Sequence, residues 1–317
     1  MKQEIPIFFT IDDEYAPFLS CAINSIIDNA SKDYIYKFII LHEKLSKVNI
    51  EKLSRLKKPG FEVEFHEMKE GLEKITDRDE NKLNCKYFTL TIYFRLLIAE
   101  MFPEYNKGIY LDSDIIVLGD ISKLYNIELD NNLIAACPDY SIQEIPILTK
   151  YLREAIGVKE KEYINSGVLL MNLKELRNNN FFSHFLNLLD TYHFDSVAPD
   201  QDYINAICNG KIYYLDEKWD AMPNNNKKPL KNPSIIHYNL FQKPWCYDNI
   251  QYEDYFWKYA KKSEFYEQIL KYKEEFSDKK KSADEQSFKR LIKKADTISG
   301  TQNTFRNRYE NGEKIRI

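Results

Sequence analysis

Short apolar runs alternate with amphipathic segments along most of the chain. A short apolar run predicts a strand, and a longer segment with apolar residues three or four positions apart predicts a helix. Strands are predicted at residues 5–11, 36–42, 61–68 and 107–112. Helices are predicted between them at residues 16–28, 46–58 and 89–102. Strands that alternate with helices indicate βαβ units and a parallel sheet.

The alternation continues less regularly after residue 120. Further strands are predicted at residues 133–139, 165–173, 211–215 and 233–238. Further helices are predicted at residues 178–192, 200–208 and 252–276. No internal repeat is visible, and 317 residues suffice for one large α/β domain or two small ones.

The composition excludes several classes of protein. The chain is 44% hydrophobic with a net charge of −4, so it has a sizeable core and no general footprint for nucleic acid. No stretch reaches the roughly 18 apolar residues of a spanning helix. The cysteines are widely spaced and indicate buried, reduced thiols rather than a zinc site or disulfide framework: Cys21, Cys85, Cys137, Cys208 and Cys246. We therefore expect a cytoplasmic protein.

The composition changes near Ser277. Residues 277–317 hold eleven Lys or Arg and six Asp or Glu, so their net charge is +5 and that of the rest is −9. Only residues 288–295 (FKRLIKKA) have amphipathic character. We expect a main domain at residues 1–276 and a weakly packed basic tail at 277–317. Such a tail would contact a partner or an anionic membrane at its inner face.

The segment GIYLDSDIIVLGD, residues 108–120, carries the first candidate chemistry. Asp112 and Asp114 close an apolar run with only Ser113 between them. In an extended strand both carboxylates would face one side and Ser113 the other. Two like charges so close need an offset, and a divalent cation such as Mg²⁺ or Mn²⁺ suits carboxylate oxygens. The alternative is a pair of solvated turn residues.

A second observation favours the cation. The chain contains neither of the glycine-rich motifs that cradle phosphates, G-x-G-x-x-G and G-x-x-x-x-G-K-[ST]. If a nucleotide binds here, a metal held by the two aspartates could neutralise its phosphates instead.

Several motifs in order resemble the retaining glycosyltransferases of family 8, which include bacterial lipopolysaccharide galactosyl- and glucosyltransferases and glycogenin. The matching segments are FTIDDEYAPFL, TIYFRLLIAE, GIYLDSDIIVLGDISKLY, YINSGVLLMNL, PDQDYINAI and IIHYNLFQKPW. They span roughly residues 5–276. The resemblance implies one Rossmann-like α/β domain of the GT-A type with a mixed, mostly parallel sheet.

The resemblance also implies residue roles in binding a UDP-sugar. A metal ion, Mn²⁺ or Mg²⁺, would be held by Asp112, Asp114 and His237. Lys243 would meet the diphosphate. The remaining donor contacts would come from Asp12, Asp13, Tyr15, Ser113 and Ser166. The catalytic residues around the sugar would be Arg95, Asn165, Asp200 and Gln201.

Each role has an ordinary structural alternative. Asp12, Asp13 or Asp200 could cap a helix, and Arg95 could be a surface residue whose stem packs. His237 could be a core histidine and Lys243 a solvated lysine. The chain departs from the family pattern at Glu14, where Asn is frequent. It departs again at Leu240, where Gly is frequent three residues before the lysine.

The implied reaction moves a hexose, glucose or galactose, from UDP to an acceptor hydroxyl with retention. Glycosidases retain configuration with a carboxylate nucleophile, but the residue expected at that place is Gln201, a poor nucleophile. We therefore favour front-face attack with the leaving diphosphate as base, and Asp200 as nucleophile is the alternative.

Two rival functions remain at this stage. A haloacid-dehalogenase-type phosphatase also uses a D-x-D motif after an apolar strand, but that family usually places it near the N-terminus. A non-catalytic UDP-sugar-binding protein would keep the residues without turnover. The acceptor, whether a glycan, a lipid-linked sugar or a protein, and any homo-oligomer are not set by the sequence.

Overall fold

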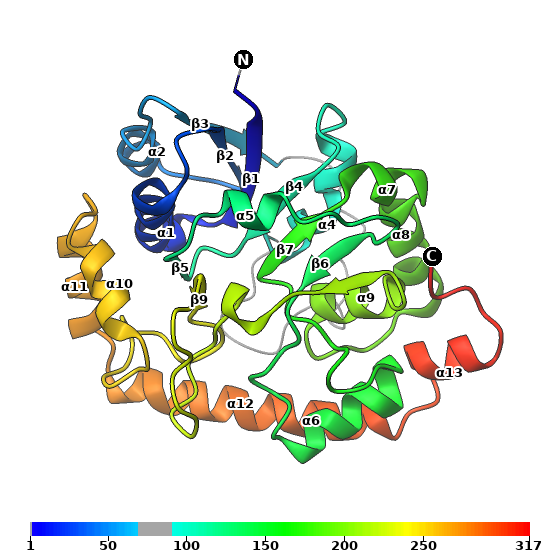
Figure 1. Cartoon of the computed structure of the whole chain (residues 1–317). Helices are drawn as coiled ribbons and strands as arrows, with labels where there is room; N and C mark the ends of the chain where they lie inside the picture. Colours follow the sequence, from blue (N-terminus) through cyan, green and yellow to red (C-terminus); the bar gives the residue numbers. More distant parts are fainter. Residues whose placement is uncertain (1, 69–90) are drawn as a thin grey trace.

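The computed structural model describes residues 2–68 and 91–317 (Figure 1). Cys85 and the first two residues of the helix predicted at 89–102 lie outside this range. A seven-stranded sheet forms the centre, in the order β3-β2-β1-β4-β7-β6-β8. Its strands are β1 (Glu4–Ile11), β2 (Ile35–His42), β3 (Phe61–Glu67), β4 (Gly108–Leu111), β6 (Ile134–Ala136), β7 (Val168–Met171) and β8 (Ile212–Tyr214).

The sheet is mixed and mostly parallel, as expected. Strands β1 to β4 pair in parallel, as do β6 and β8, whereas β7 runs antiparallel to both β4 and β6. A second sheet pairs β5 (Ile115–Val117) with β9 (Ile235–His237), antiparallel. Because β7 is reversed, the residues that precede it lie at the same edge as those that follow β1 and β4.

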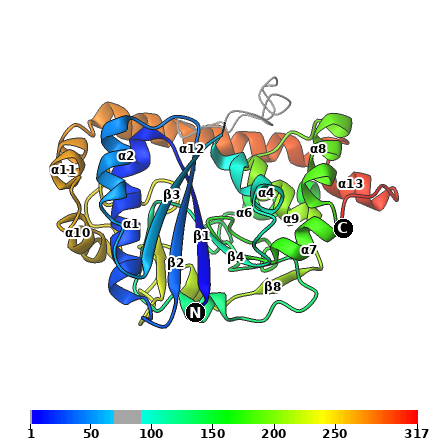
Figure 2. The same cartoon turned by 90° about the horizontal axis from the view of Figure 1, so that it is seen from above.

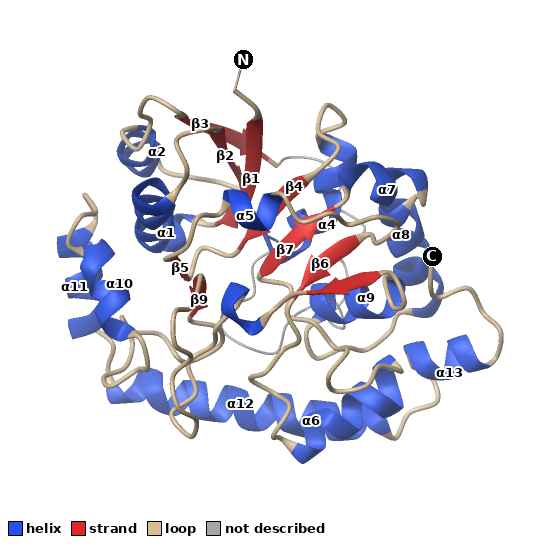
Figure 3. Cartoon of the chain, in the orientation of Figure 1, coloured by secondary structure: helices blue, strands red, loops and turns tan. Residues whose placement is uncertain are grey.

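Helices cover both faces of the central sheet (Figures 2 and 3). Helix α1 (Ala16–Asn29) packs on one face together with Ile7 and Phe9 of β1, and helix α4 (Thr91–Met101) packs on the other face with Phe8. This alternation follows from the strand period of two residues. Two apolar clusters, one on each face, therefore make up the core.

The helices agree with the sequence pattern in position but not always in length. The helix predicted at 46–58 ends at Ser54, and the one predicted at 252–276 is two helices. The α-helices are α1 (Ala16–Asn29), α2 (Lys47–Ser54), α4 (Thr91–Met101), α5 (Ser122–Tyr125), α6 (Pro146–Tyr151), α7 (Leu173–Asn178), α8 (Phe181–Tyr192), α9 (Pro199–Ile207), α10 (Glu253–Ala260), α11 (Tyr266–Glu274), α12 (Asp278–Ser299) and α13 (Phe305–Glu310). Shorter helical turns are η1 (Asp13–Tyr15), η3 (Leu152–Ile156) and η4 (Glu217–Trp219). Across the described part of the chain, no helix combines the length and apolar character that crossing a bilayer requires.

The C-terminal segment packs more closely than its composition predicts. Residues 278–299 form the 22-residue helix α12, which runs beside α6 below the sheet (Figure 1). Ala295 and Ile298 of this helix, and Phe305 and Ile315 beyond it, are almost fully buried in the core. The expectation of a weakly packed appendage is therefore wrong for these positions. The apolar residues are few, but they fall on one face of the helix.

Candidate active site

A cavity of about 1220 Å³ opens where the parallel strands β1 and β4 end. This edge of an open α/β sheet is where ligands usually bind. Twelve of the thirteen residues expected at the site line it: Asp12, Tyr15, Arg95, Asp112, Ser113, Asp114, Asn165, Ser166, Asp200, Gln201, His237 and Lys243. The fold therefore brings together residues from distant parts of the chain.

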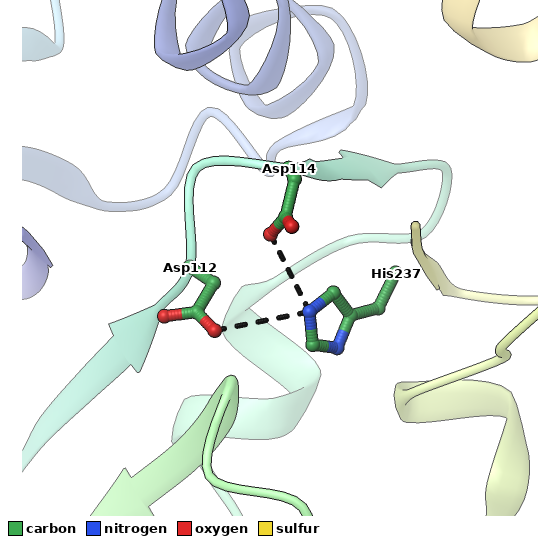
Figure 4. Close-up of side chains that lie close together, drawn as sticks. All are labelled: Asp112, Asp114 and His237. Atoms are coloured by element: carbon green, nitrogen blue, oxygen red, sulfur yellow. Dashed lines mark ion pairs between the residues drawn. The ribbon is translucent and has the colours of Figure 1, made fainter. Parts of the chain in front are cut away.

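Asp112 and Asp114 lie in the bend between β4 and β5, not in a strand. The expectation of an extended segment is therefore wrong, and Ser113 also lines the cavity instead of facing away. Both carboxylates nevertheless approach the His237 ring (Figure 4). His237 Nε2 lies 3.8 Å from Asp112 Oδ2 and 3.4 Å from Asp114 Oδ1. One potential ligand atom from each of the three residues falls within 4.8 Å of the others.

His237 is oriented by a fourth residue, Asp220. The two side chains are buried, and His237 Nδ1 lies 3.0 Å from Asp220 Oδ1. Burial alone would lower the pKa of His237, but Asp220 and Asp114 raise it well above its usual value. Burial raises the pKa of Asp220 to about 6. A carboxylate on one ring nitrogen fixes the other toward the cavity, which is the arrangement of metal-binding histidines, although Nε2 must lose its proton to act as a ligand.

Arg95 on α4 offsets part of the electrostatic repulsion between Asp112 and Asp114. It is 5% exposed, and its Nη2 donates to Asp112 Oδ1 at 3.0 Å. The guanidinium lies 4.4 Å from the ring centre of Tyr110, whose hydroxyl donates to the same carboxylate oxygen at 2.6 Å. Thr10 holds that hydroxyl at 2.9 Å. Asp112 is therefore held by Arg95 and Tyr110, and Thr10 orients the Tyr110 hydroxyl.

Lys243 offsets the remaining repulsion at Asp114. Its ammonium group contacts the Asp114 carboxylate and donates to the carbonyl oxygen of Tyr238 at 3.0 Å. Burial alone would raise the pKa of Asp114, but Lys243 and then His237 lower it. The repulsion between the two aspartates is thus offset by one cation on each of them.

Asp200 and Gln201 begin α9 and face the same space. Asp200 is buried and lies 3.2 Å from Arg95 Nε, and burial raises the pKa of its carboxyl. The Gln201 amide is fixed at both ends. Its oxygen accepts from Ser166 N at 2.9 Å, and its nitrogen donates to Asp139 Oδ2 at 3.1 Å.

Because Gly167 has no side chain, His237 and Asp112 can approach each other beside it. A Cβ at this position would lie 2.3 Å from His237 Cε1 and 2.7 Å from Asp112 Oδ2. Its carbonyl oxygen accepts from Asp112 N at 2.7 Å. Only glycine permits this close approach without displacing one of the two side chains.

A model of the family described as "Glycosyl transferase family 8" matches residues 6–249. The chain belongs to this family. A putative glycosyltransferase of Haemophilus influenzae is 30% identical over 254 residues, which cover 77% of this chain and 74% of the relative. The lipopolysaccharide 1,2-glucosyltransferase of Escherichia coli is 24% identical over 266 residues, covering 77% and 75%.

A solved glycosyltransferase structure has the same architecture. The crystal structure of the galactosyltransferase LgtC, in complex with donor and acceptor sugar analogs, superposes with a TM-score of 0.72 at 25% identity. The alignment covers 84% of this chain and all of that one, at 100%. The predicted GT-A-like α/β fold is confirmed. The protein is a glycosyltransferase of family 8 whose described residues include a potential metal-binding triad.

The family 8 resemblance placed three N-terminal residues at the nucleotide, and the structure separates them. Asp12 and Tyr15 line the cavity, and Asp12 also caps the turn after β1 by accepting from Tyr15 N at 3.0 Å. Asp13 does not line it. Its carboxylate instead accepts from Ser46 N at 2.7 Å and from Asn49 at 2.9 Å, which ties η1 to α2.

Leu240, where family 8 chains often have Gly, keeps a backbone conformation that favours Gly. Its φ is +49° and its side chain is 39% exposed. The left-handed conformation costs a side-chain-bearing residue roughly 1–2 kcal/mol. The loop therefore follows a glycine-like path and delivers Lys243 to Asp114 despite the substitution.

The sequence pattern missed three residues that shape the site. Asp139 ends a predicted strand, so it carried the same signal as Asp112 and could have been found. Gly167 lies in the NSGVLL motif, but its contact with His237 depends on β9 reaching β5. Asp220 had no local signal, because only the tertiary fold brings it to His237. Four residues of α12 also line the cavity: Asp284, Glu285, Phe288 and Leu291.

Proposed function

We propose that this family 8 protein is a metal-dependent, retaining glycosyltransferase that moves a hexose, glucose or galactose, from UDP to an acceptor hydroxyl. The observation that carries the proposal is the convergence of Asp112, Asp114 and His237 on one point of the cavity wall. Two carboxylates and an imidazole suit Mn²⁺, and carboxylates suit Mg²⁺. The donor sugar follows from relatives named as a glucosyltransferase and a galactosyltransferase.

The metal would be held by Asp112, Asp114 and His237. When bound, it supplies positive charge that stabilises a departing diphosphate. Asp220 holds the His237 ring in the orientation that leaves Nε2 for the cation. Lys243, already against Asp114, offers a second positive charge to the phosphates.

Arg95, Asp200 and Gln201 would position the sugar. Arg95 fixes the Asp200 carboxylate, so that it accepts from hydroxyls in a constant place. That same ion pair and the bond from Ser166 make Asp200 a poorer nucleophile. Gln201 is an amide held by Asp139 and Ser166. Both features support front-face attack by the acceptor rather than a covalent intermediate.

For the uridine we propose Asp12 and Tyr15, and not Asp13, whose carboxylate is engaged with the start of α2. We propose further contacts to the UDP-sugar from three residues that line the same cavity: Ser113, Asn165 and Ser166. The membrane contact and cytoplasmic location expected from the composition remain proposals.

The test is a panel of UDP-sugars with the full chain, scored for UDP release. Release from UDP-glucose or UDP-galactose that needs Mn²⁺ or Mg²⁺ and stops with a chelator supports the proposal. Hydrolysis of p-nitrophenyl phosphate without use of any UDP-sugar would support the phosphatase alternative. Saturable binding of a UDP-sugar without turnover would support a binding protein.

A further inference from the structure

The cavity is larger than a single substrate needs. Its volume of about 1220 Å³ exceeds the range of roughly 300–1,000 Å³ typical of small-molecule sites. Beyond the strand ends it extends to α12 and to α6 with the segment before it. We call these lining residues the outer wall: Ile142, Glu144, Ile145, Leu148, Asp284, Glu285, Phe288 and Leu291. This space suits the second substrate of a transferase.

Helix α12 presents acidic side chains to the cavity, although residues 277–317 as a whole are basic. Asp284 and Glu285 line the cavity, with Phe288 and Leu291 one and two turns further along the same face. The exposed bases Lys289 and Lys293 are not part of the lining. A segment with a net charge of +5 thus presents carboxylates to the site.

The lining of the whole cavity also has a negative net charge. Besides His237, its described lining has two bases: Arg95, which is ion-paired with Asp112 and Asp200, and Lys243, which contacts Asp114. The acids in the lining are Asp12, Glu14, Asp112, Asp114, Asp139, Glu144, Asp200, Asp248, Asp284 and Glu285.

Two of these acids are neutralised from outside the lining. Lys227 lies 3.0 Å from Glu144, and Lys273 lies 2.9 Å from Asp248. Ten carboxylates against these four bases leave an excess of six negative formal charges, or five with His237 protonated. A UDP-hexose and one divalent cation have opposite and equal formal charges, so their binding would leave that excess in place. An incoming acceptor would therefore meet a negative potential.

We propose that the outer wall binds the acceptor and ranks acceptors by charge, with ammonium-bearing sugars preferred to neutral ones and neutral ones to phosphorylated ones. The inference rests on the proposed function, because only a transferase needs an acceptor. Phe288, in an edge-to-face pair with Phe241 at 6.3 Å, offers an apolar surface to the C–H face of a sugar ring. Glu285 is the exposed carboxylate of the wall that would accept from sugar hydroxyls, attract an ammonium group and repel phosphate, whereas Glu144 and Asp284 are engaged with Lys227 and Tyr247.

The first experiment measures binding of three matched probes to the full chain with Mg²⁺ and UDP. The probes are methyl galactoside, its 2-amino-2-deoxy analogue and its 6-phosphate, and the method is saturation-transfer NMR titration. We expect affinity to fall by about 3- to 10-fold at each step from amine to neutral to phosphate, and the steps to shrink in high salt. Equal affinities, tightest binding of the phosphate, or no binding of any probe would contradict the proposal.

The second experiment reverses one charge of the outer wall. Glu285→Lys should narrow or reverse the preference for the amine over the phosphate. Glu274→Lys makes the same change of two charge units at an exposed position of α11, outside the lining, and is the matched control. If both variants change the preference equally, the selection does not act at the outer wall.

The two proposals fail in different ways. If no UDP-sugar releases UDP, even slowly to water, the proposed function is wrong. If UDP-sugars are turned over but phosphorylated sugars accept as well as amino sugars, only the acceptor inference is wrong.

Discussion

At the strand ends the cavity wall consists of charged side chains that are buried and paired with one another, whereas along α12 it consists of apolar groups and acids on a partly exposed helix face. Arg95 and Lys243 each hold one of the paired aspartates, and Asp220 holds His237. We call these four residues, with Asp112, Asp114 and Asp200, the inner site. Its groups are fixed before any ligand arrives, which is the preorganisation that catalysis requires. The outer wall is less constrained, which suits recognition of a variable acceptor.

The largest effect should follow from changing the inner site itself. Asp114→Asn removes a ligand charge and the partner of Lys243, so we expect metal-dependent UDP release to fall by roughly 10³-fold or more, equivalent to about 4 kcal/mol. The loss of its ion pair should also lower stability slightly. Asp130→Asn, at an exposed turn outside the cavity, is the matched control. Full activity of Asp114→Asn would remove this residue from the metal site.

Stability should depend on α12 more than its composition suggests. Ile298 is 1% exposed, so Ile298→Ala should lower the free energy of unfolding by about 2–5 kcal/mol in a denaturant titration. Thr297→Ala, on the exposed side of the same turn, should change it by less than about 0.5 kcal/mol. Equal, small effects would show that the segment is the loosely attached tail that its charge predicts.

A smaller effect on the inner site should come from Gly167→Ala. The new methyl group would displace His237 or Asp112, and we expect metal affinity to fall by about 10- to 100-fold, as when groups that orient a metal ligand are changed. Gly300→Ala is the control, because its Cβ would only meet Thr297 O at 3.5 Å. Calorimetric titration with Mn²⁺ measures this affinity. If Gly167→Ala binds Mn²⁺ as tightly as the wild type does, the metal binds elsewhere.

The outward face of α12 should bind anionic membranes weakly. Each Lys near such a surface contributes about 1 kcal/mol, so Lys289→Glu with Lys293→Glu should reduce co-sedimentation with phosphatidylserine vesicles at low salt. The wild-type chain should itself be released at high salt. If the double variant sediments like the wild type, the basic face of α12 is not a membrane contact.

The smallest effect concerns the loop that carries Lys243. Leu240→Gly removes the backbone strain of a left-handed residue in the folded state, but it also raises the conformational entropy of the unfolded chain. These two effects on stability nearly cancel. We expect the free energy of unfolding to change by less than about 1 kcal/mol, with UDP release retained. A large loss of activity would mean that the Leu240 side chain itself contacts a substrate.

Part of the inner site was predictable from strong local signals, and the family 8 resemblance supplied Arg95, His237 and Lys243, whereas Asp220 carried no signal. Asp12 and Asp112 each follow an apolar strand, and Asp200 begins a helix. The bend at Asp112–Asp114 was not predictable, since a strand can stop after four residues without any Gly or Pro. Asp12 and Asp13 look alike in sequence, and only the contact of Asp13 with the start of α2 distinguishes them.

The outer wall was not predictable from the sequence. The buried face of α12 includes Asp284 and Ser287, so its apolar period is broken exactly where the helix meets the cavity and Tyr247. Its partner α6 precedes it by more than a hundred residues. These buried polar side chains hid the first part of the helix from pattern analysis, which found amphipathic character only at residues 288–295. The lining role of α12 therefore became visible only in the folded chain.

The central claim is that Asp112, Asp114 and His237 hold a metal beside the diphosphate of a nucleotide sugar. Crystals of the full chain grown with Mn²⁺ and UDP, measured at the manganese absorption edge, test it most directly. We predict a single anomalous peak in the cavity between the two carboxylates and His237 Nε2, with the UDP phosphates on its open side near Lys243. UDP bound without such a peak, or a manganese peak away from these three side chains, would contradict the account.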